Sequence, residues 1–523
     1  MIIKKSNVLL IVCAFICVAI VGIISCNSGT QSTGDRKAAI AEYMANGKAL
    51  SKQYCQSCHM YPEPGLLNQD KWLVVLPEMG LRLGIKQHKE QDYTNTIDPS
   101  DFTPPSAAAM SAVEWQNILN YYLSKAPINL PEQKRNIAID RQLPFFKVQK
   151  PASIFNGKQV LSSFVKIDNT VNPARVFVAN AQAHKLYLLT PQLKIVDSVE
   201  TEGPVVDMLF NNNQIFVTTI GKTLGANADK IGTVTELSIN NGKIISGKVP
   251  LFNNLARPVQ LLTADLNNDN KQDYLICEFG NMNGELVWME NKGPGNFIKH
   301  VISSRPGATK AYFDYRKNPL APDIWVLFAQ AREGIYHFIN NGKGSFTEKQ
   351  VLGFPPIYGS SSFDMVDMDN DGDKDIIYTC GDNGNASLSL KPYHGLYIYL
   401  NDGRDNFKQR YFYPVNGCYK AIAKDFDGDN KIDIATVSLF TDAAQPAEGF
   451  VYFKNTGNLT FKPYALPPKV RFERAVTMDA GDIDADGKTD LIIGNNYFEN
   501  GPFGYYNVTE PLFFTLKNTA KNK

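Results

Sequence analysis

A multidomain protein, with a small all-α domain followed by an all-β domain, is predicted by three features of the sequence. Residues 55–59 read Cys-Gln-Ser-Cys-His, and apolar residues recur at helical spacing in the segments that follow. Beyond Lys134 the chain changes to short alternating strands separated by Gly and Asn turns. Within this strand-rich region an acidic pattern of nine residues occurs four times, which indicates a structural repeat.

Residues 1–25 are expected to be a secretory signal of the lipoprotein type. Lys4 and Lys5 precede an apolar stretch over 8–24, and a small residue follows it. The run Ile-Ile-Ser-Cys over 23–26 resembles the bacterial lipobox, which implies that Cys26 carries a lipid anchor. An uncleaved single-span anchor is the alternative. Residues 26–40 are expected to form a flexible tether because the beginning of this segment is rich in Ser, Thr, Gly and Asn.

The run from Cys55 to His59 is typical of covalent c-type haem attachment. Its two thiols can form thioethers with the haem vinyl groups, and the adjacent histidine can bind the iron. Zinc sites and redox dithiols also use C-x-x-C, but no second ligand pair follows at short spacing and no βαβ pattern surrounds the motif. We therefore expect one covalent haem c on Cys55 and Cys58, with His59 as the proximal iron ligand.

Two helices are expected after this motif. Apolar residues at helical spacing predict the first helix over 68–84, and an S-x-x-E capping box at 111–114 predicts the start of the second, which should end at Pro127. The region resembles small bacterial cytochrome c domains, in which C-x-x-C-H precedes a W-x-x-x-V/L-x-x-M helix and a final helix ending in Y-Y/F-L. Here these correspond to 72–79 and 120–123. We expect a cytochrome c domain over 41–128 and a linker over 129–150.

The sixth iron ligand has three candidates. Met79 lies 20 residues past His59 and matches the helix methionine of the family, so it is favoured. Met110 is the runner-up, although it directly precedes the Ser111 cap, where an apolar residue also serves as a hydrophobic staple. His88 would give bis-histidine ligation. A thioether ligand raises the haem potential and suits electron transfer.

The repeated acidic pattern has the form of a calcium loop. It places oxygen side chains at positions 1, 3, 5 and 9, and Gly or Asn at the sharp turn of position 6. The position 7 residue would contribute its backbone carbonyl. The expected ligands of three to four calcium ions are Asp265, Asn267, Asp269, Lys271, Asp273, Asp367, Asp369, Asp371, Asp373, Asp375, Asp425, Asp427, Asp429, Lys431, Asp433, Asp482, Asp484, Asp486, Lys488 and Asp490.

Each loop resembles the FG-GAP or VCBS repeat family, which implies a β-propeller with calcium between strands. Asn267 replaces an acid, so the first loop should be the weakest site. The last three loops start 58 and 57 residues apart, whereas the first two are 102 apart. A second marker, N-x-G followed by Phe, indicates a blade in that gap whose loop, over 314–323, has lost its ligands. With strand units over 165–180 and 205–219, we expect an all-β propeller of about seven blades over 151–523.

Composition limits the partners. The 53 Lys and Arg balance the 52 Asp and Glu, which leaves no basic excess for nucleic acid. Of the eight cysteines, Cys277, Cys380 and Cys418 remain after the signal, the lipid and the haem are accounted for. Two of these three could be joined in a disulfide, but their odd number leaves at least one free or paired outside the chain.

Together these features predict a membrane-anchored c-type cytochrome of the bacterial cell envelope, lipid-anchored and periplasmic or outer-membrane facing. It would transfer electrons to or from a redox partner protein, and its calcium-binding propeller would serve as a docking or ligand-binding platform. No catalytic constellation is recognised in the propeller, so an enzyme is less favoured. One alternative is a quinohaemoprotein-like dehydrogenase whose propeller holds the substrate. The other is a calcium-dependent glycan- or protein-binding scaffold.

Overall fold

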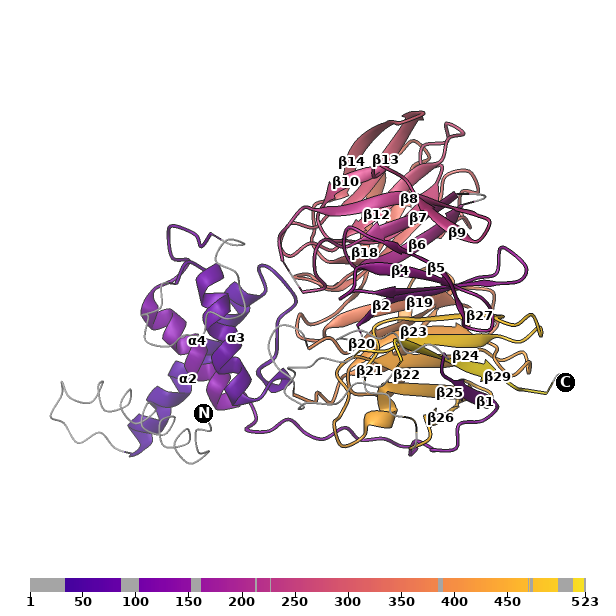
Figure 1. Ribbon diagram of the computed structural model, residues 1–523. Helices are drawn as coiled ribbons and strands as arrows, with labels where there is room; N and C mark the ends of the chain where they lie inside the picture. Colours follow the sequence, from indigo (N-terminus) through magenta and orange to yellow (C-terminus); the bar gives the residue numbers. More distant parts are fainter. Residues whose placement is uncertain are drawn as a thin grey trace.

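The computed structural model describes residues 33–85, 103–151, 161–211, 214–225, 227–383, 389–468, 470, 474–496 and 511–521. A group of helices lies beside a β-propeller (Figure 1). The predicted signal, Cys26 and His88 lie outside the described residues. Within the described ranges of the chain, the helices are too short or too polar to span a membrane.

The helical domain contains α2 (Thr33–Cys55), α3 (Gln69–Arg82) and α4 (Ala112–Lys125), with the short 3-10 helix η1 (Pro64–Leu66) before α3. The two expected helices are confirmed as α3 and α4. The capping box is also present, since Glu114 N–H donates to Ser111 Oγ at 3.3 Å and Ser111 N–H donates to Glu114 Oε2 at 2.8 Å.

Helix α2 corrects the expectation of a flexible tether over 26–40. From Thr33 onward this segment is helical and continues without a break into the C-x-x-C-H motif. Its sequence is rich in Ala and Lys, which favour helix, and it packs against α4. The helix therefore begins inside the segment that was expected to be a flexible tether.

Aromatic residues form the centre of the helical core. Trp72 and Tyr122 are buried, and their rings meet edge to face at 4.6 Å. Trp72 Nε1 donates to the carbonyl of Pro64, and Tyr122 Oη donates to the carbonyl of Pro62, both at 2.7 Å. The loop that follows the C-x-x-C-H motif is thereby tied to both α3 and α4.

Seven antiparallel sheets form the propeller, which confirms the expected number of blades. Blades 1 to 3 consist of β2 (Ser162–Asp168), β3 (Arg175–Asn180), β4 (Lys185–Leu189) and β5 (Ile195–Glu200); β6 (Val205–Asn211), β7 (Gln214–Thr219), β8 (Gly232–Asn240), β9 (Lys243–Ser246) and β10 (Phe252–Leu255); and β11 (Pro258–Ala264), β12 (Asp273–Glu278), β13 (Leu286–Gly293) and β14 (Asn296–Ser303).

Blades 4 to 7 have four strands each. They consist of β15 (Ala308–Asp314), β16 (Asp323–Phe328), β17 (Gly334–Asn340) and β18 (Phe346–Gly353); β19 (Ser360–Val366), β20 (Asp375–Cys380), β21 (Gly395–Asn401) and β22 (Phe407–Pro414); β23 (Cys418–Lys424), β24 (Asp433–Ser438), β25 (Phe450–Asn455) and β26 (Phe461–Ala465); and β27 (Met478–Gly481), β28 (Asp490–Gly494), β29 (Phe513–Asn518) and β1 (Phe146–Gln149). The short helix η2 (Pro446–Gly449) precedes β25.

The ring is closed by a strand from the other end of the propeller sequence. The first strands of neighbouring blades contact one another all the way round, and β27 contacts β2. In blade 7 the outermost strand is β1, which pairs antiparallel with β29 from Phe146↔Asn518 to Gln149↔Thr515. The expected boundary, a linker over 129–150 and a propeller from 151, was therefore wrong, because β1 lies inside that linker and belongs to the propeller.

The three propeller cysteines form no disulfide. Cys277, Cys380 and Cys418 are all free and buried in β12, β20 and β23. Burial raises the pKa of the Cys380 thiol to about 12. These side chains therefore pack as small apolar groups of the core.

Candidate cofactor and metal sites

The C-x-x-C-H motif lies where α2 ends. Cys55 is the last residue of the helix, and the chain turns immediately afterwards, with Ser57 N–H donating to the carbonyl of Tyr54 at 3.3 Å. Cys55 is half-buried against the helical core and Cys58 is exposed, and neither is in a disulfide. Burial raises the pKa of the Cys55 thiol to about 11. One thiol thus contacts the core and the other is open to solvent on the same turn.

His59 is oriented in a way that suits a metal ligand. Its Nδ1 lies 2.9 Å from the carbonyl oxygen of Met60. Because a carbonyl can only accept, Nδ1 carries the proton and Nε2 keeps its lone pair. Burial lowers the pKa of His59, which favours the neutral ring. In metal sites, a ligating histidine usually donates its other ring N–H to a backbone carbonyl or a carboxylate. His59 therefore fits the role of an axial iron ligand.

The structure brings both candidate methionines to the core that Cys55 contacts. Met79 is half-buried on α3, and Met110 is buried directly before the Ser111 cap. Each side chain therefore fills part of the helical core, and the sixth ligand stays a prediction.

The C-x-x-C-H motif and the segment after it, residues 55–66 (the motif loop), contact blades 4 and 5 of the propeller. Arg332, between β16 and β17, donates from Nη2 to the carbonyl of Ser57 at 3.4 Å. Tyr393, just before β21, donates from Oη to the carbonyl of Leu66 at 3.0 Å. Ile357, between β18 and β19, packs against the helical core. Figure 1 shows the helices on this side of the propeller. The propeller thus contacts the turn that contains the two thiols.

The four acidic loops share one backbone geometry. Each joins the first and second strands of its blade, and its position 1 carboxylate accepts backbone N–H groups from within the loop. In the second loop, Asp367 accepts from Asp371 N–H at 3.2 Å and from Gly372 N–H at 3.0 Å. Position 6 has a positive φ in all four loops, between 62° and 95°. The sharp turn expected there is confirmed.

Position 9 has a structural role that sequence reasoning missed. Asp375 is fully buried, and its two oxygens accept Met368 N–H at 2.8 Å and Asn401 N–H at 2.9 Å. The asparagine belongs to the N-x-G marker at the end of the third strand. The equivalent Asp323 in blade 4 accepts Asn340 N–H at 2.7 Å although that blade has no acidic loop. This carboxylate therefore fastens the loop to the third strand with or without a cation.

Three of the four loops bring carboxylates together. In each of three triplets one oxygen per residue lies within 4.8 Å of the others, and the described residues contain no such triplet in the first loop. There the side-chain amide of Asn267 donates to Glu290 Oε1 at 2.8 Å instead. The triplets are Asp367, Asp369 and Asp371; Asp425, Asp427 and Asp433; and Asp482, Asp484 and Asp490.

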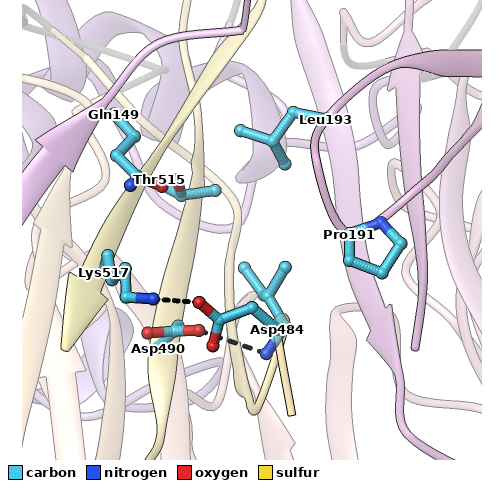
Figure 2. Close-up of a pocket in the computed structure, with 8 residues that line it drawn as sticks. Gln149, Pro191, Leu193, Asp484, Asp490, Thr515 and Lys517 are labelled. Carbon is cyan, nitrogen blue, oxygen red and sulfur yellow. Dashed lines mark hydrogen bonds and ion pairs between the residues drawn. The ribbon is translucent and has the colours of Figure 1, made fainter. Parts of the chain in front are cut away.

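The loops at 425 and 482 also fit a cation on independent grounds. Asp427 is only 8% exposed, and its Oδ1 has no hydrogen-bond partner, which is costly for a buried carboxylate oxygen. Beside the last loop lies a cavity of about 30 Å³, between blade 7 and the turn that joins β4 to β5 (Figure 2). It is lined by Gln149, Pro191, Leu193, Ile483, Asp484, Asp490, Thr515 and Lys517. Carboxylate oxygens at such sites are the ligands that calcium prefers.

The lysines predicted at position 7 contribute no side-chain oxygen. The ammonium groups of Lys271 and Lys431 pair with Asp269 at 3.1 Å and Asp429 at 2.7 Å. Lys488, in the last loop, donates its backbone N–H to Asp486 at 3.0 Å. At these positions the residue can therefore offer only its carbonyl.

Blade 4 contains a guanidinium where blades 3, 5, 6 and 7 have a loop of acids. Arg316 pairs with Asp314 at 2.8 Å and reaches Asp405 at 3.4 Å and Asp373 at 3.6 Å. Burial alone would raise the pKa of Asp314, but hydrogen bonds from Arg316 and its charge lower that pKa to about 2. The arginine of blade 4 therefore supplies a positive charge beside these carboxylates.

The comparisons with known proteins support the repeats. A family model described as FG-GAP-like repeat matches residues 321–378 and 425–493. This chain carries FG-GAP repeats. The two FG-GAP segments run from the start of β16 into β20, and from the third acidic loop into β28. Among curated proteins, no sequence matches this chain.

The solved structures that match this chain share little sequence with it. One is a chain from an S. cerevisiae complex of dbp5 with nup159 and gle1, at 11% identity and TM-score 0.43, covering 74% of this chain and 97% of that chain. A lectin of Agrocybe aegerita has 16% identity and TM-score 0.35, with 70% and 96% covered. BBS1N in complex with ARL6DN has 10% identity and TM-score 0.42, with 72% and 99% covered.

Proposed function

We propose that this protein is a c-type cytochrome that transfers electrons, with one haem joined covalently to Cys55 and Cys58. When bound, the haem iron supplies one-electron redox chemistry. His59 is the proximal ligand, and its Nδ1–H bond to Met60 is the observation that supports the proposal most, because it fixes the ring and leaves Nε2 for the iron. Met79 is the favoured sixth ligand and Met110 the runner-up.

The FG-GAP propeller is a scaffold suited to binding, and we propose that it docks a redox partner protein beside the haem. Arg332 and Tyr393 hold the motif loop against blades 4 and 5, so a partner seated on these blades lies close to the site of electron exchange. The helical core around Trp72 and Tyr122 shields one side of the motif from water. A lipid on Cys26 would keep the protein at a membrane of the bacterial cell envelope.

We further propose that calcium binds the acidic loops, at three sites and weakly at a fourth, the loop of Asp265. A cation there would offset the repulsion between carboxylates and stabilise the propeller. An ion that binds only the folded state adds about 2.7 kcal/mol per site when its free concentration is a hundredfold above Kd. Chelation should therefore lower the melting temperature of the propeller and leave the haem spectrum unchanged.

The haem proposal is tested by maturing the full chain in a host that attaches haem c. The wild-type protein should keep its haem absorption after extraction with acidified solvent. The double variant C55A/C58A should lose it, because thioether bonds can no longer form, whereas Cys277→Ala, a buried cysteine of the propeller, should not. Covalent haem in the double variant, or none in the wild type, would disprove the proposal.

A further inference from the structure

One residue of the third strand has an equivalent place in each of the last three blades. It directly precedes the asparagine whose N–H is bound by the position 9 aspartate. These asparagines are Asn401, Asn455 and Asn518, bound at 2.9, 2.7 and 2.7 Å. The preceding residues of blades 5, 6 and 7 are Leu400, Lys454 and Lys517.

The two lysines insert their charge into the loops. Lys454 Nζ pairs with Asp427, and Lys517 Nζ pairs with Asp484 and lies 3.6 Å from Asp486. Figure 2 shows the contact of Lys517 with Asp484 at the edge of the cavity.

Blade 5 differs because Leu400 has no charge. Among the described residues, no cationic group pairs with Asp367, Asp369 or Asp371. Arg316 does pair with a residue of this loop, Asp373 at position 7, at 3.6 Å, but Asp373 is not part of the triplet. Blade 5 is thus the blade whose acid triplet most needs an external cation.

A lysine ammonium compensates only part of the negative charge of these loops and leaves one of their oxygens without a hydrogen-bond partner. Lys454 binds Oδ2 of Asp427, while Oδ1 of the same carboxylate stays buried without a partner. A single positive charge also leaves most of the charge of three carboxylates uncompensated. Calcium takes six to eight oxygens and carries twice the charge. Calcium and lysine therefore compete for the same carboxylates, and calcium must displace the lysine to bind.

We propose that Lys454 and Lys517 are resident counter-ions that weaken calcium binding at the loops of Asp425 and Asp482, so that the loop of Asp367 is the tight site. This inference rests on the calcium binding proposed above. The propeller then needs calcium chiefly in blade 5, while blades 6 and 7 stay partly neutralised without it and take up calcium only at higher concentration.

The test is a calcium titration of the full chain after chelation, by isothermal calorimetry. Besides the weak fourth site at the loop of Asp265, the wild type should bind one ion tightly and two at least tenfold more weakly. Lys454→Met, which keeps the apolar stem and removes the charge, should convert one weak site into a tight one, and K454M/K517M should give three tight sites. Lys349→Met, an exposed lysine of β18 with no acidic loop beside it, is the control and should change nothing.

The converse variant adds a second readout. Leu400→Lys should weaken the tight site at least tenfold and reduce the loss of melting temperature on chelation. If the wild type binds three ions with equal affinity and the lysine variants do not alter it, the inference about the lysines is wrong while calcium binding stands. If neither the wild type nor K454M/K517M binds calcium, the calcium proposal itself is wrong.

Discussion

Replacing Arg316 by methionine should destabilise blade 4, because it leaves the buried Asp314 carboxylate without its counter-charge. The folded protein holds the pKa of Asp314 at about 2, against an ordinary value of 3.8. That difference corresponds to about 2.4 kcal/mol at neutral pH. Asp314 is 6% exposed, so solvent screens little of it. Because the folded pKa is depressed, this stabilisation is complete above the unfolded pKa, falls to about 1.3 kcal/mol at pH 3, and disappears below pH 2.

Urea unfolding of the full chain at pH 7 and pH 3, followed by tryptophan fluorescence, measures this effect. Trp325 reports on the site directly, since its Nε1 donates to Asp314 at 3.3 Å. The matched control is Lys317→Met, which removes the ion pair of an exposed lysine with Asp405 and should cost less than about 1 kcal/mol. A loss below about 0.5 kcal/mol for Arg316→Met at pH 7, or an equal loss at both pH values, would refute the reasoning.

Three more outcomes are expected. Met79→Ala should abolish the weak near-infrared band of a methionine-ligated ferric haem and lower its potential; loss of that band in Met110→Ala instead would move the ligand to Met110. Ser111→Ala should destabilise the helical domain by about 1 kcal/mol, seen as a lower urea midpoint, by removing a capping hydrogen bond. Burial raises the pKa of Glu333 to about 8, so stability should fall as pH rises from 4.5 to 8, and unfolding of Glu333→Gln should lack that fall.

The blade number was predictable because its signals are local. An acidic loop or an N-x-G turn marks each of blades 3 to 7 within a few residues, so the spacing of these marks counts blades directly. Strand β1 gave no such signal. It is a four-residue segment whose sheet partner, β29, lies at the other end of the propeller sequence, and pairing over that distance leaves no pattern in either segment. Helix α2 was missed because a run of Ser and Gly conceals where the helix formers begin.

In the candidate sites, too, features that depend on adjacent residues were predictable from sequence, and features that depend on distant residues were not. The C-x-x-C-H motif and the turn at position 6 depend on adjacent residues, and they were found from sequence. The roles of Arg316, Lys454 and Lys517 depend on which strand lies over which loop. Antiparallel pairing brings Lys454 to Asp427 from 27 residues away, so a pattern confined to one loop cannot include it. For the same reason the sequence did not reveal that the position 9 aspartate accepts two backbone hydrogen bonds.

The pairing of β1 with β29 has a consequence for the order in which the chain is made. A ribosome delivers Phe146 long before Asn518, so β1 waits for its sheet partner β29 while all the other blades are synthesised. The residues up to Ala126 include nearly all of the helical core and can collapse well before that. A premature stop codon just before Phe513 would remove β29, so that β28 would keep β27 on one side but have an unpaired edge on the other, and β1 would lose its sheet partner. Unpaired edges of this kind recruit other chains, so such a truncation should cause aggregation and not merely a shorter protein.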